Sequence, residues 1–367
     1  MSILDSGVKF VKNPDQYVIG EGTVAELISV FANNNIKNPI VFVDKYFECL
    51  KLEWIPEHAK IIYVDCLNEP TTDGIDCIMQ KLRPLHISKT FDAVVSVGGG
   101  STMDTGKAVS NLLTNKGLAS EYQGWDLVKE PGVYKIAIPS ISGTGAESTR
   151  TCVMTNKETN LKLGMNSDYS VYNFIIMDPL LMKTVPKEQL FFTAMDAYIH
   201  CVESLSGRYR NPIGDAYSDI TLKLCESIFR SGDLYSRESR ENLMVASYLG
   251  GLSIATSYVG LIHPFSAGLS VVYGTKHCLG NCIALTGLQK YYPNAYNNML
   301  EWLILNDIKL PKFSEKLDHN ELNQLFKGTI IHNKPLYNAL GEKYQSILNL
   351  DEVSKCFVEM KNFMNNQ

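Results

Sequence analysis

A carboxylate and an imidazole lie four residues apart in the stretch AMDAYIHCVES, residues 194–204. The neighbouring residues are mostly apolar and indicate a helix, in which side chains four positions apart share one face. Asp196 and His200 are therefore a polar pair on a helix that otherwise reads as part of a core. Alone, the pair is compatible with a metal site, with support of a neighbouring site, or with a simple hydrogen-bonded couple.

Two further histidines, His263 and His277, lie in an apolar, glycine-rich stretch, residues 258–282, where an imidazole without a partner would be costly to bury. One carboxylate and three neutral imidazoles suit Fe²⁺ or Zn²⁺ and leave coordination positions open. Such a metal is a Lewis acid that lowers the pKa of an alcohol, so that its carbon can release a hydride. We therefore predict a metal site of Asp196, His200, His263 and His277. The other four histidines lie in polar contexts and are interpreted as surface residues: His58, His86, His319 and His332.

The stretch VVSVGGGSTMDTGKAVS, residues 94–110, has the pattern of a phosphate-binding loop. A buried strand ends in three glycines, Gly98, Gly99 and Gly100, and a helix begins at Ser101, so unhindered backbone amides meet the positive end of a helix dipole. A tight turn is the alternative, but three successive glycines exceed what a turn needs. The spacing is not GxGxxG, so a strict Rossmann fingerprint does not apply. Asp104 and Lys107 follow on the opening turns of the helix, as charges of the site or as solvated helix residues.

A second glycine-rich turn follows another predicted strand, in IPSISGTGAESTR, residues 138–150. Ser140 and Thr144 are small hydroxyl donors there, although serine and glycine are also ordinary loop residues. Asp44 ends the strand IVFVD, where a carboxylate can accept the ribose hydroxyls of a dinucleotide and repel a 2′-phosphate. This favours NAD over NADP; a turn aspartate is the alternative.

Short β-branched runs separated by amphipathic stretches must position these loops. Four predicted strands, PIVFVD, KIIYVD, DAVVSV and YKIAIP, occupy residues 39–44, 60–65, 92–97 and 134–139. This rhythm is typical of a parallel sheet covered by helices. After Pro186, a natural first-turn proline, the pattern becomes helical throughout. We predict an α/β domain, residues 1–185, and an all-helical domain, residues 186–367, with a cleft between them.

Composition limits the class of partner. The chain has 367 residues, 45% of them hydrophobic, and a net charge of −5, so neither nucleic acid nor a membrane is an expected partner. Charged residues interrupt the N-terminus, which does not read as a secretory signal. Nine scattered cysteines without a CxxC pair are typical of a reduced, cytoplasmic protein. The expected partner is a small molecule.

Taken together, the motifs resemble the iron-containing, group III alcohol dehydrogenase family. The resemblance runs nearly end to end, through YVIGEGTVAEL, GGGSTMDTGKAV, IPSISGTGAEST, DPLLMKTVP, MDAYIHCVES and NPIGDAYS. It implies a dehydroquinate-synthase-like fold, with a Rossmann-like dinucleotide-binding α/β domain and a helical metal-binding domain, and most simply a homodimer. The metal ligands of the family fall on the four residues predicted above. Its coenzyme contacts fall on Asp44, Gly98, Gly99, Gly100, Ser101, Asp104, Ser140, Thr144 and Lys162.

One departure from the family concerns proton transfer. Many members have a further histidine four residues after the third ligand, and here that position is Ala267. The HP dipeptide of this chain starts at His263, 14 residues before His277, which fits the ligand position. The usual proton relay is therefore missing, and water or Asp104 is left to take the alcohol proton.

Within the family, the chain is most similar to the 3-deoxy-manno-octulosonate (Kdo) 8-oxidases of lipopolysaccharide sugar modification. The similar stretches include LKLGMNSDYSVYNF, YIHCVESLSGRYRNPIGDAYS and HPFSAGLSVVYG. The resemblance implies oxidation of the C8 primary alcohol of an acidic sugar to an aldehyde, for a later aminotransferase. Arg150, Arg208 and Arg210 are candidates for binding its carboxylate, and surface ion pairs are the alternative for each.

Three other readings stay open at this point. The first is an NAD-dependent enzyme of the same family that acts on a small alcohol, diol or aldehyde. The second is a dehydroquinate-synthase-like cyclase, against which the aspartate at position 196 argues, because that group normally has glutamate as first ligand. The third is an inactive binding protein. The sequence decides neither between iron and zinc nor between NAD and oxygen as electron acceptor.

Overall fold

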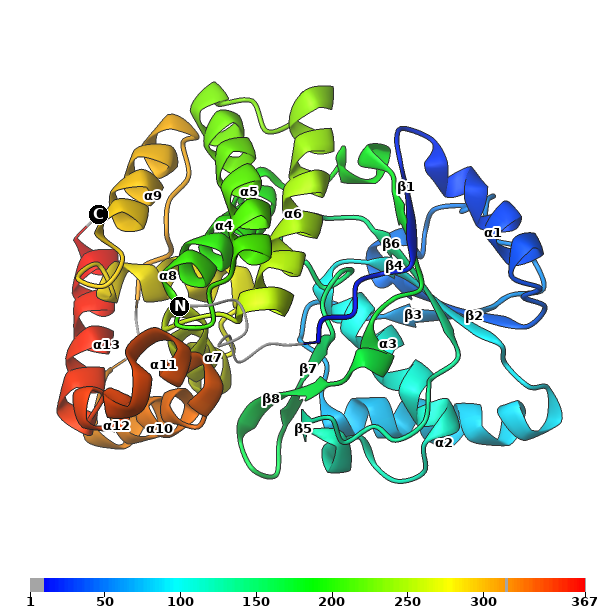
Figure 1. Ribbon diagram of the computed structural model, residues 1–367, viewed down its shortest axis with the longest axis horizontal. Coiled ribbons are helices and arrows are strands. Elements are labelled where there is room, and N and C mark those ends of the chain that lie inside the picture. Colours follow the sequence, from blue (N-terminus) through cyan, green and yellow to red (C-terminus); the bar gives the residue numbers. More distant parts are fainter. Residues whose placement is uncertain (1–9, 314–315, 367) are drawn as a thin grey trace. The chain divides into compact units, whose positions relative to one another are not determined.

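The structure is a computed structural model that describes residues 10–313 and 316–366. The chain divides into two compact units: one is residues 12–184, and the other is residues 185–366 together with the described residues 10 and 11. The first contains every strand found in the described residues and the second consists of helices and loops (Figure 1). The parallel α/β half and the helical half that the sequence predicts are confirmed.

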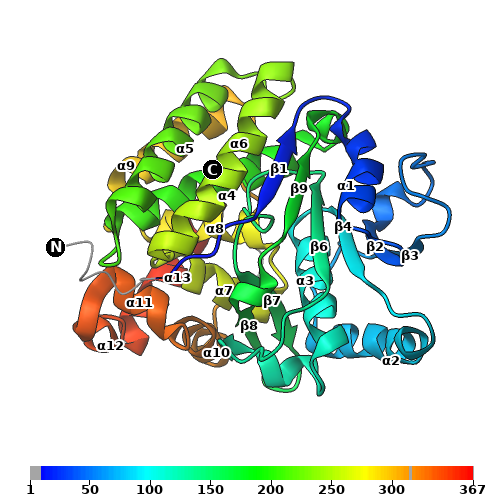
Figure 2. The ribbon, with the colours of Figure 1, turned by 45° about the vertical axis from the view of Figure 1, so that its right-hand side comes forward.

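The α/β unit is built on a six-stranded sheet in the order β1-β9-β6-β4-β2-β3, and all neighbouring strands in it are parallel. Figure 2 shows β1, β9, β6 and β4 side by side. The central strands are mostly apolar because helices cover both faces of a parallel sheet. In sheet order, the strands are Gln16–Ile19, Phe174–Met177, Tyr134–Pro139, Ala93–Gly98, Pro39–Asp44 and Lys60–Val64.

Alternate side chains of the strands enter two separate hydrophobic cores. Val94 of β4 packs in one core with helices α2, Thr72–Ser88, and α3, Gly100–Thr114. Val95 packs in the other core with helix α1, Leu27–Asn33. Packing of α3 against the sheet thereby fixes the position of the first turn of α3, where the glycine loop lies.

A second, three-stranded sheet in the same unit is not anticipated by the strand rhythm. Its order is β5-β8-β7, with β7 and β8 antiparallel and β5 parallel to β8. The strands are β5, Gly124–Trp125, β7, Thr151–Asn156, and β8, Leu161–Asn166. This sheet carries Lys162 and contacts α3 through β7.

The helical unit is arranged around α4, Lys187–Ser206, which contacts α5, α6 and α8 and buries most of its residues. Burial by these neighbours explains why apolar residues predominate in the middle of the helix. The helices that follow are α5 Pro212–Ser231, α6 Arg237–Ser257, α7 Ile262–Tyr273, α8 His277–Gly287, α9 Pro293–Leu305, α10 His319–Ile330, α11 Asn333–Leu340, α12 Tyr344–Ile347 and α13 Leu350–Asn365.

Within the described residues, no single helix is both long and apolar enough to cross a membrane. Helices α6 and α7 reach that length and apolar composition only when they are taken together, and the chain bends by 105° between them.

Candidate metal centre and coenzyme loops

Helix α4 presents three polar side chains along one buried face. Asp196, His200 and Glu203 follow at i, i+4 and i+7, the spacing of one helical stripe. Asp196 and Glu203 are fully buried, and His200 is 2% exposed. Such groups are stable in a core only when other polar groups satisfy them, so the partners must come from other helices.

The partners come from the first turns of α7 and α8. His263 is the second residue of α7 and His277 is the first residue of α8. Measured to the carboxylate of Asp196, the Nε2 atoms of His200, His263 and His277 lie at 3.6, 3.5 and 3.6 Å. One ligand atom from each of the four residues lies within 4.8 Å of the other three.

Electrostatics leave Asp196 and His200 in the forms that bind a metal, whereas His263 must give up a proton when a metal binds. Burial raises the pKa of Asp196, but the neighbouring imidazoles of His200 and His277 hold it well below its usual range, so the carboxylate is ionised. Burial lowers the pKa of His200 to about 4, so this imidazole is neutral at pH 7. Burial lowers the pKa of His263, the carboxylates of Glu203 and Asp196 raise it, and the balance in the protein without metal is about 9.

This donor set fits a divalent metal such as Fe²⁺ or Zn²⁺. Three imidazole nitrogens and one carboxylate converge from three helices, and such a cluster is costly to bury without a cation among it. His277 is 31% exposed whereas Asp196 is fully buried, so solvent reaches the cluster at His277. This is the arrangement expected of a catalytic metal site that keeps a position for a substrate.

Two residues that the sequence reasoning did not single out also belong to this cluster. The Nδ2 group of Asn281 donates a hydrogen bond to Asp196 at 2.6 Å and lies 3.2 Å from Nε2 of His263. Glu203 contacts Nδ1 of His263. Helical spacing in the sequence could have identified both residues. Glu203 continues the stripe of Asp196 and His200, and Asn281 follows His277 by four residues.

The glycine loop connects strand β4 to helix α3, and its backbone packs closely against neighbouring side chains. A Cβ on Gly98 would lie 2.4 Å from Oγ1 of Thr102, and one on Gly99 would lie 2.8 Å from Ile141. Positions 98 and 99 therefore have no room for a side chain, which accounts for glycine directly before the first amides of α3.

The other coenzyme candidates at the sheet edge gather around this loop. A Cβ on Gly98 would lie 3.1 Å from Cβ of Asp44, and one on Gly100 would lie 3.2 Å from Oγ1 of Thr144. The backbone N–H of Ser140 donates to the carbonyl of Gly98 at 3.0 Å. The carboxyl ends of β2, β4 and β6 thus meet at one edge of the sheet, where ligands of open α/β sheets bind. The carboxylate of Asp44 also accepts from the N–H of Tyr46 at 3.0 Å.

Asp104 and Lys162 lie in a charged group beside helix α3. The Asp104 carboxylate accepts the backbone N–H of Val153 at 3.0 Å, and burial raises the pKa of Asp104 to about 6 against the lowering effect of Lys107. Lys162 is paired with Glu69 at 2.5 Å. Lys107 is fully buried and donates to carbonyls that flank the second glycine-rich turn.

The three arginines differ in their surroundings. Arg150 pairs with Asp126 and with Asp168, the latter at 3.1 Å, and Arg210 pairs with both oxygens of Asp215 at 2.8 and 2.9 Å. Arg208 is exposed, and among the described residues it has no carboxylate partner. Ala267, in place of the family's proton-relay histidine, is 8% exposed on α7.

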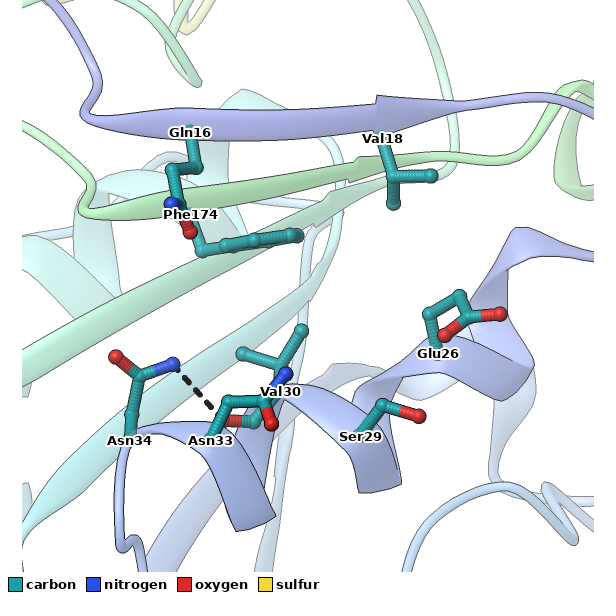
Figure 3. Close-up of a pocket in the computed structure, with 8 residues that line it drawn as sticks. All are labelled: Gln16, Val18, Glu26, Ser29, Val30, Asn33, Asn34 and Phe174. Carbon is teal, nitrogen blue, oxygen red and sulfur yellow. Dashed lines mark hydrogen bonds between the residues drawn. The ribbon is translucent and has the colours of Figure 1, made fainter.

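A separate hollow lies in the α/β unit between strand β1 and helix α1 (Figure 3). Val18, Phe174 and Val30 form its apolar wall, and Asn34 donates to the Val30 carbonyl at 2.9 Å. None of the predicted site residues lines it, so it is not the coenzyme site.

Comparison with known proteins agrees with this geometry along most of the chain. The profile of the family described as "Iron-containing alcohol dehydrogenase" matches residues 14–179, and that of the "Fe-containing alcohol dehydrogenase family, C-terminal" matches residues 191–327. The chain belongs to this family. It is an oxidoreductase of the class that acts on CH–OH groups.

Two relatives and one structure show the range of the likeness. The NAD-dependent methanol dehydrogenase of Bacillus methanolicus is 28% identical over 74% of this chain and 72% of that protein. The sulfoacetaldehyde reductase of Bilophila wadsworthia is 31% identical over 59% of this chain and 56% of that protein. A 1,3-propanediol oxidoreductase crystal structure has a TM-score of 0.82 and 21% identity, and the match covers 96% of this chain and all of the other, which shows that the fold is shared.

Proposed function

We propose that this chain is a metal-dependent, NAD-linked oxidoreductase that interconverts a primary alcohol and its aldehyde. The convergence of Asp196, His200, His263 and His277 within 4.8 Å carries the proposal. The glycine loop at the start of α3, with Asp44 beside it, supports the coenzyme. The named NAD dependence of the methanol dehydrogenase relative agrees with it.

Each part of the proposed site has a separate task. A bound divalent metal supplies Lewis acidity, which lowers the pKa of the alcohol hydroxyl. Asp196 supplies the negative charge of the ligand set, and the neutral His200 supplies a lone pair. The amides after Gly99 would hold the pyrophosphate of the coenzyme, and the Asp44 carboxylate would accept hydrogen bonds from its ribose hydroxyls. A bound NAD⁺ would supply the acceptor for the hydride of the alcohol carbon, and the hydroxyl proton would pass to water or Asp104, because Ala267 cannot accept it.

The finer proposal is that the substrate is Kdo and that its C8 primary alcohol becomes the 8-aldehyde for later amination in lipopolysaccharide biosynthesis. The motif likeness to Kdo 8-oxidases supports it. Arg208 supports it too, because an exposed guanidinium without a carboxylate partner among the described residues can bind a sugar carboxylate. The name of the sulfoacetaldehyde reductase relative indicates that this scaffold also handles an anionic substrate.

An aromatic group beside Arg208 adds a surface suited to a sugar. The rings of Tyr209 and Tyr258 meet edge to face at 5.1 Å, and the ammonium of Lys334 lies 5.7 Å from the centre of the Tyr258 ring. Tyr258 has φ +59° and ψ 167°, a backbone conformation that is rare outside glycine. It stands five residues before His263, so the strained residue opens the segment that leads to the ligand.

The test is mass spectrometry of Kdo after incubation with metal-loaded protein, with and without NAD⁺. Loss of two hydrogens at C8, only with NAD⁺ present, is the expected result. Arg208→Ala should raise the KM for Kdo with kcat little changed, and Arg230→Ala, on the surface of α5, is the matched control. Unchanged Kdo with metal and coenzyme both bound would refute the substrate proposal.

A small alcohol, diol or aldehyde is the second candidate substrate, and the methanol dehydrogenase relative favours it. Arg208→Ala should then have no effect on KM, because a neutral substrate gives the guanidinium nothing to bind. A panel of primary alcohols and diols assayed by NADH formation, with the same variant, separates the two candidates.

A further inference from the structure

Glu203 stands behind His263 and not among the atoms that face the metal position. Its Oε2 contacts Nδ1 of His263, whereas Nε2 of the same ring faces Asp196 at 3.5 Å. The two ring nitrogens point in different directions, so a carboxylate bound to one cannot also reach a cation bound to the other. Glu203 is fully buried and is separated from the four-residue cluster by the imidazole ring itself.

The second oxygen of Glu203 is engaged by the backbone. Its Oε1 accepts the N–H of Ile262, the first residue of α7, at 2.5 Å. That N–H belongs to the open first turn of a helix, where a carboxylate is favourable. The N–H of Leu261 is held by the Tyr292 hydroxyl at 3.1 Å, so the start of α7 is fixed at successive amides.

The segment before α7 is shaped to admit Glu203. A Cβ on Gly260 would lie 2.6 Å from the Tyr292 hydroxyl and 3.2 Å from Oε1 of Glu203. Any other residue at position 260 would displace one of these groups. Glu203 therefore defines both where His263 lies along the chain and how its ring is turned.

We propose that Glu203 is a positioning residue of the metal centre, which holds His263 in the tautomer with its proton on Nδ1 and its lone pair on Nε2. Histidine ligands commonly donate their second N–H to a carboxylate, and loss of that partner costs about 10- to 100-fold in metal affinity. This support is given to His263 and not to His200, because among the described residues Nδ1 of His200 has no hydrogen-bond partner.

Glu203→Gln separates orientation from packing, because the side chain keeps its shape. A glutamine amide has one accepting oxygen, but Ile262 N–H and His263 Nδ1–H both need an acceptor. If the oxygen stays on Ile262, the NH₂ group meets Nδ1, and His263 is driven to the tautomer whose Nε2 carries the proton. The metal then loses one lone pair.

The experiment measures Co²⁺ affinity by competition with a chelator, together with the visible spectrum of the bound Co²⁺. Glu203→Gln should weaken Co²⁺ binding about 10- to 100-fold and change the spectrum, and Glu203→Asp should recover part of the affinity. Glu188→Gln, an exposed glutamate on the first turn of the same helix, is the control. Unchanged Co²⁺ affinity in Glu203→Gln would overturn the proposal.

A double-mutant cycle tests whether Glu203 acts through His263. In a His263→Ala background, Glu203→Gln should have no further effect on Co²⁺ affinity, and full additivity would contradict the proposal. If Glu203→Gln does not fold, ¹⁵N spectra of histidine in the zinc-loaded wild type decide the matter: a protonated Nδ1 on His263 is expected, and a protonated Nε2 would overturn it. The proposal rests on the metal site of the proposed function, but these readouts need no substrate and stand apart from any failure to oxidise Kdo.

Discussion

Asp104 provides a quantitative test of the electrostatics around helix α3. Burial raises the pKa of Asp104 from 3.8 to about 6 in the folded chain. The unfolded chain therefore ionises first as pH rises, so the stability associated with the protonated carboxyl is complete below pH 3.8 and is lost as pH rises through 6. Asp104→Asn keeps an oxygen that can accept the Val153 N–H but does not titrate.

The expected size of the stability change follows from the pKa values of Asp104 in the unfolded and the folded chain. Relative to Asp104→Asn, the free energy of unfolding of the wild type should fall by about 2.5 kcal/mol between pH 4 and pH 8, since each unit of pKa difference is worth about 1.36 kcal/mol. The substitution also removes a negative charge near Lys107, whose pKa is lowered by burial. The attraction between the two charges exists only where Asp104 is ionised, and it is already contained in the Asp104 pKa of about 6, so the pH dependence is the quantity to compare.

The assay is urea denaturation of protein without metal or coenzyme, at pH 4, 5, 6, 7 and 8. Asp219→Asn, at an exposed position of α5, is the control and should run parallel to the wild type at each pH. Parallel curves for Asp104→Asn and the wild type would refute the reasoning, because Asp104 would then titrate alike in the folded and unfolded chains.

Three further substitutions test the site and its supports. His277→Ala should abolish stoichiometric zinc binding, measured by elemental analysis, while far-UV circular dichroism stays unchanged; retained zinc would remove this ligand from the set. Asp44→Gly should weaken NAD binding and relax the rejection of NADP, measured by the ratio of the two Kd values, and an unchanged ratio would contradict the ribose role. Gly106→Ala should cost about 1–3 kcal/mol of stability, because the added Cβ would lie 1.9 Å from Oγ of Ser96. Adding Ser96→Ala should restore part of that loss, and equal stability of the single and double variants would disprove the clash.

Local sequence pattern determined the elements of the fold. Each of the four predicted strand segments contains a parallel strand, because runs of β-branched residues bounded by turns are typical of strands; β2, β4 and β6 are largely buried, whereas β3 lies at the sheet edge and is partly exposed. The small sheet of β5, β7 and β8 was not anticipated; in the folded chain, β7 alternates half-buried and buried residues and packs against α3. Short strands of this kind depend on their neighbours more than on their own sequence.

The candidate metal residues could be named from residue types and from the family resemblance. Their proximity in space is a property of the tertiary structure. Helical spacing predicts that Asp196 and His200 share a face, and nothing in that spacing places His263 beside them. The arginines show the same limit. Sequence lists Arg150, Arg208 and Arg210 as equal candidates, while the folded chain engages the first and last with aspartates.

By itself, the sequence determined what each segment can do: a glycine loop that opens a helix, a helix with a polar stripe, and two histidines in apolar surroundings. Only the tertiary structure decided which of these groups share a site. It brings the first turns of α7 and α8 to the face of α4 and places Glu203 on the ring of His263. The physical reason is that periodicity describes one element at a time, whereas a binding site is formed by contacts between residues far apart in the chain.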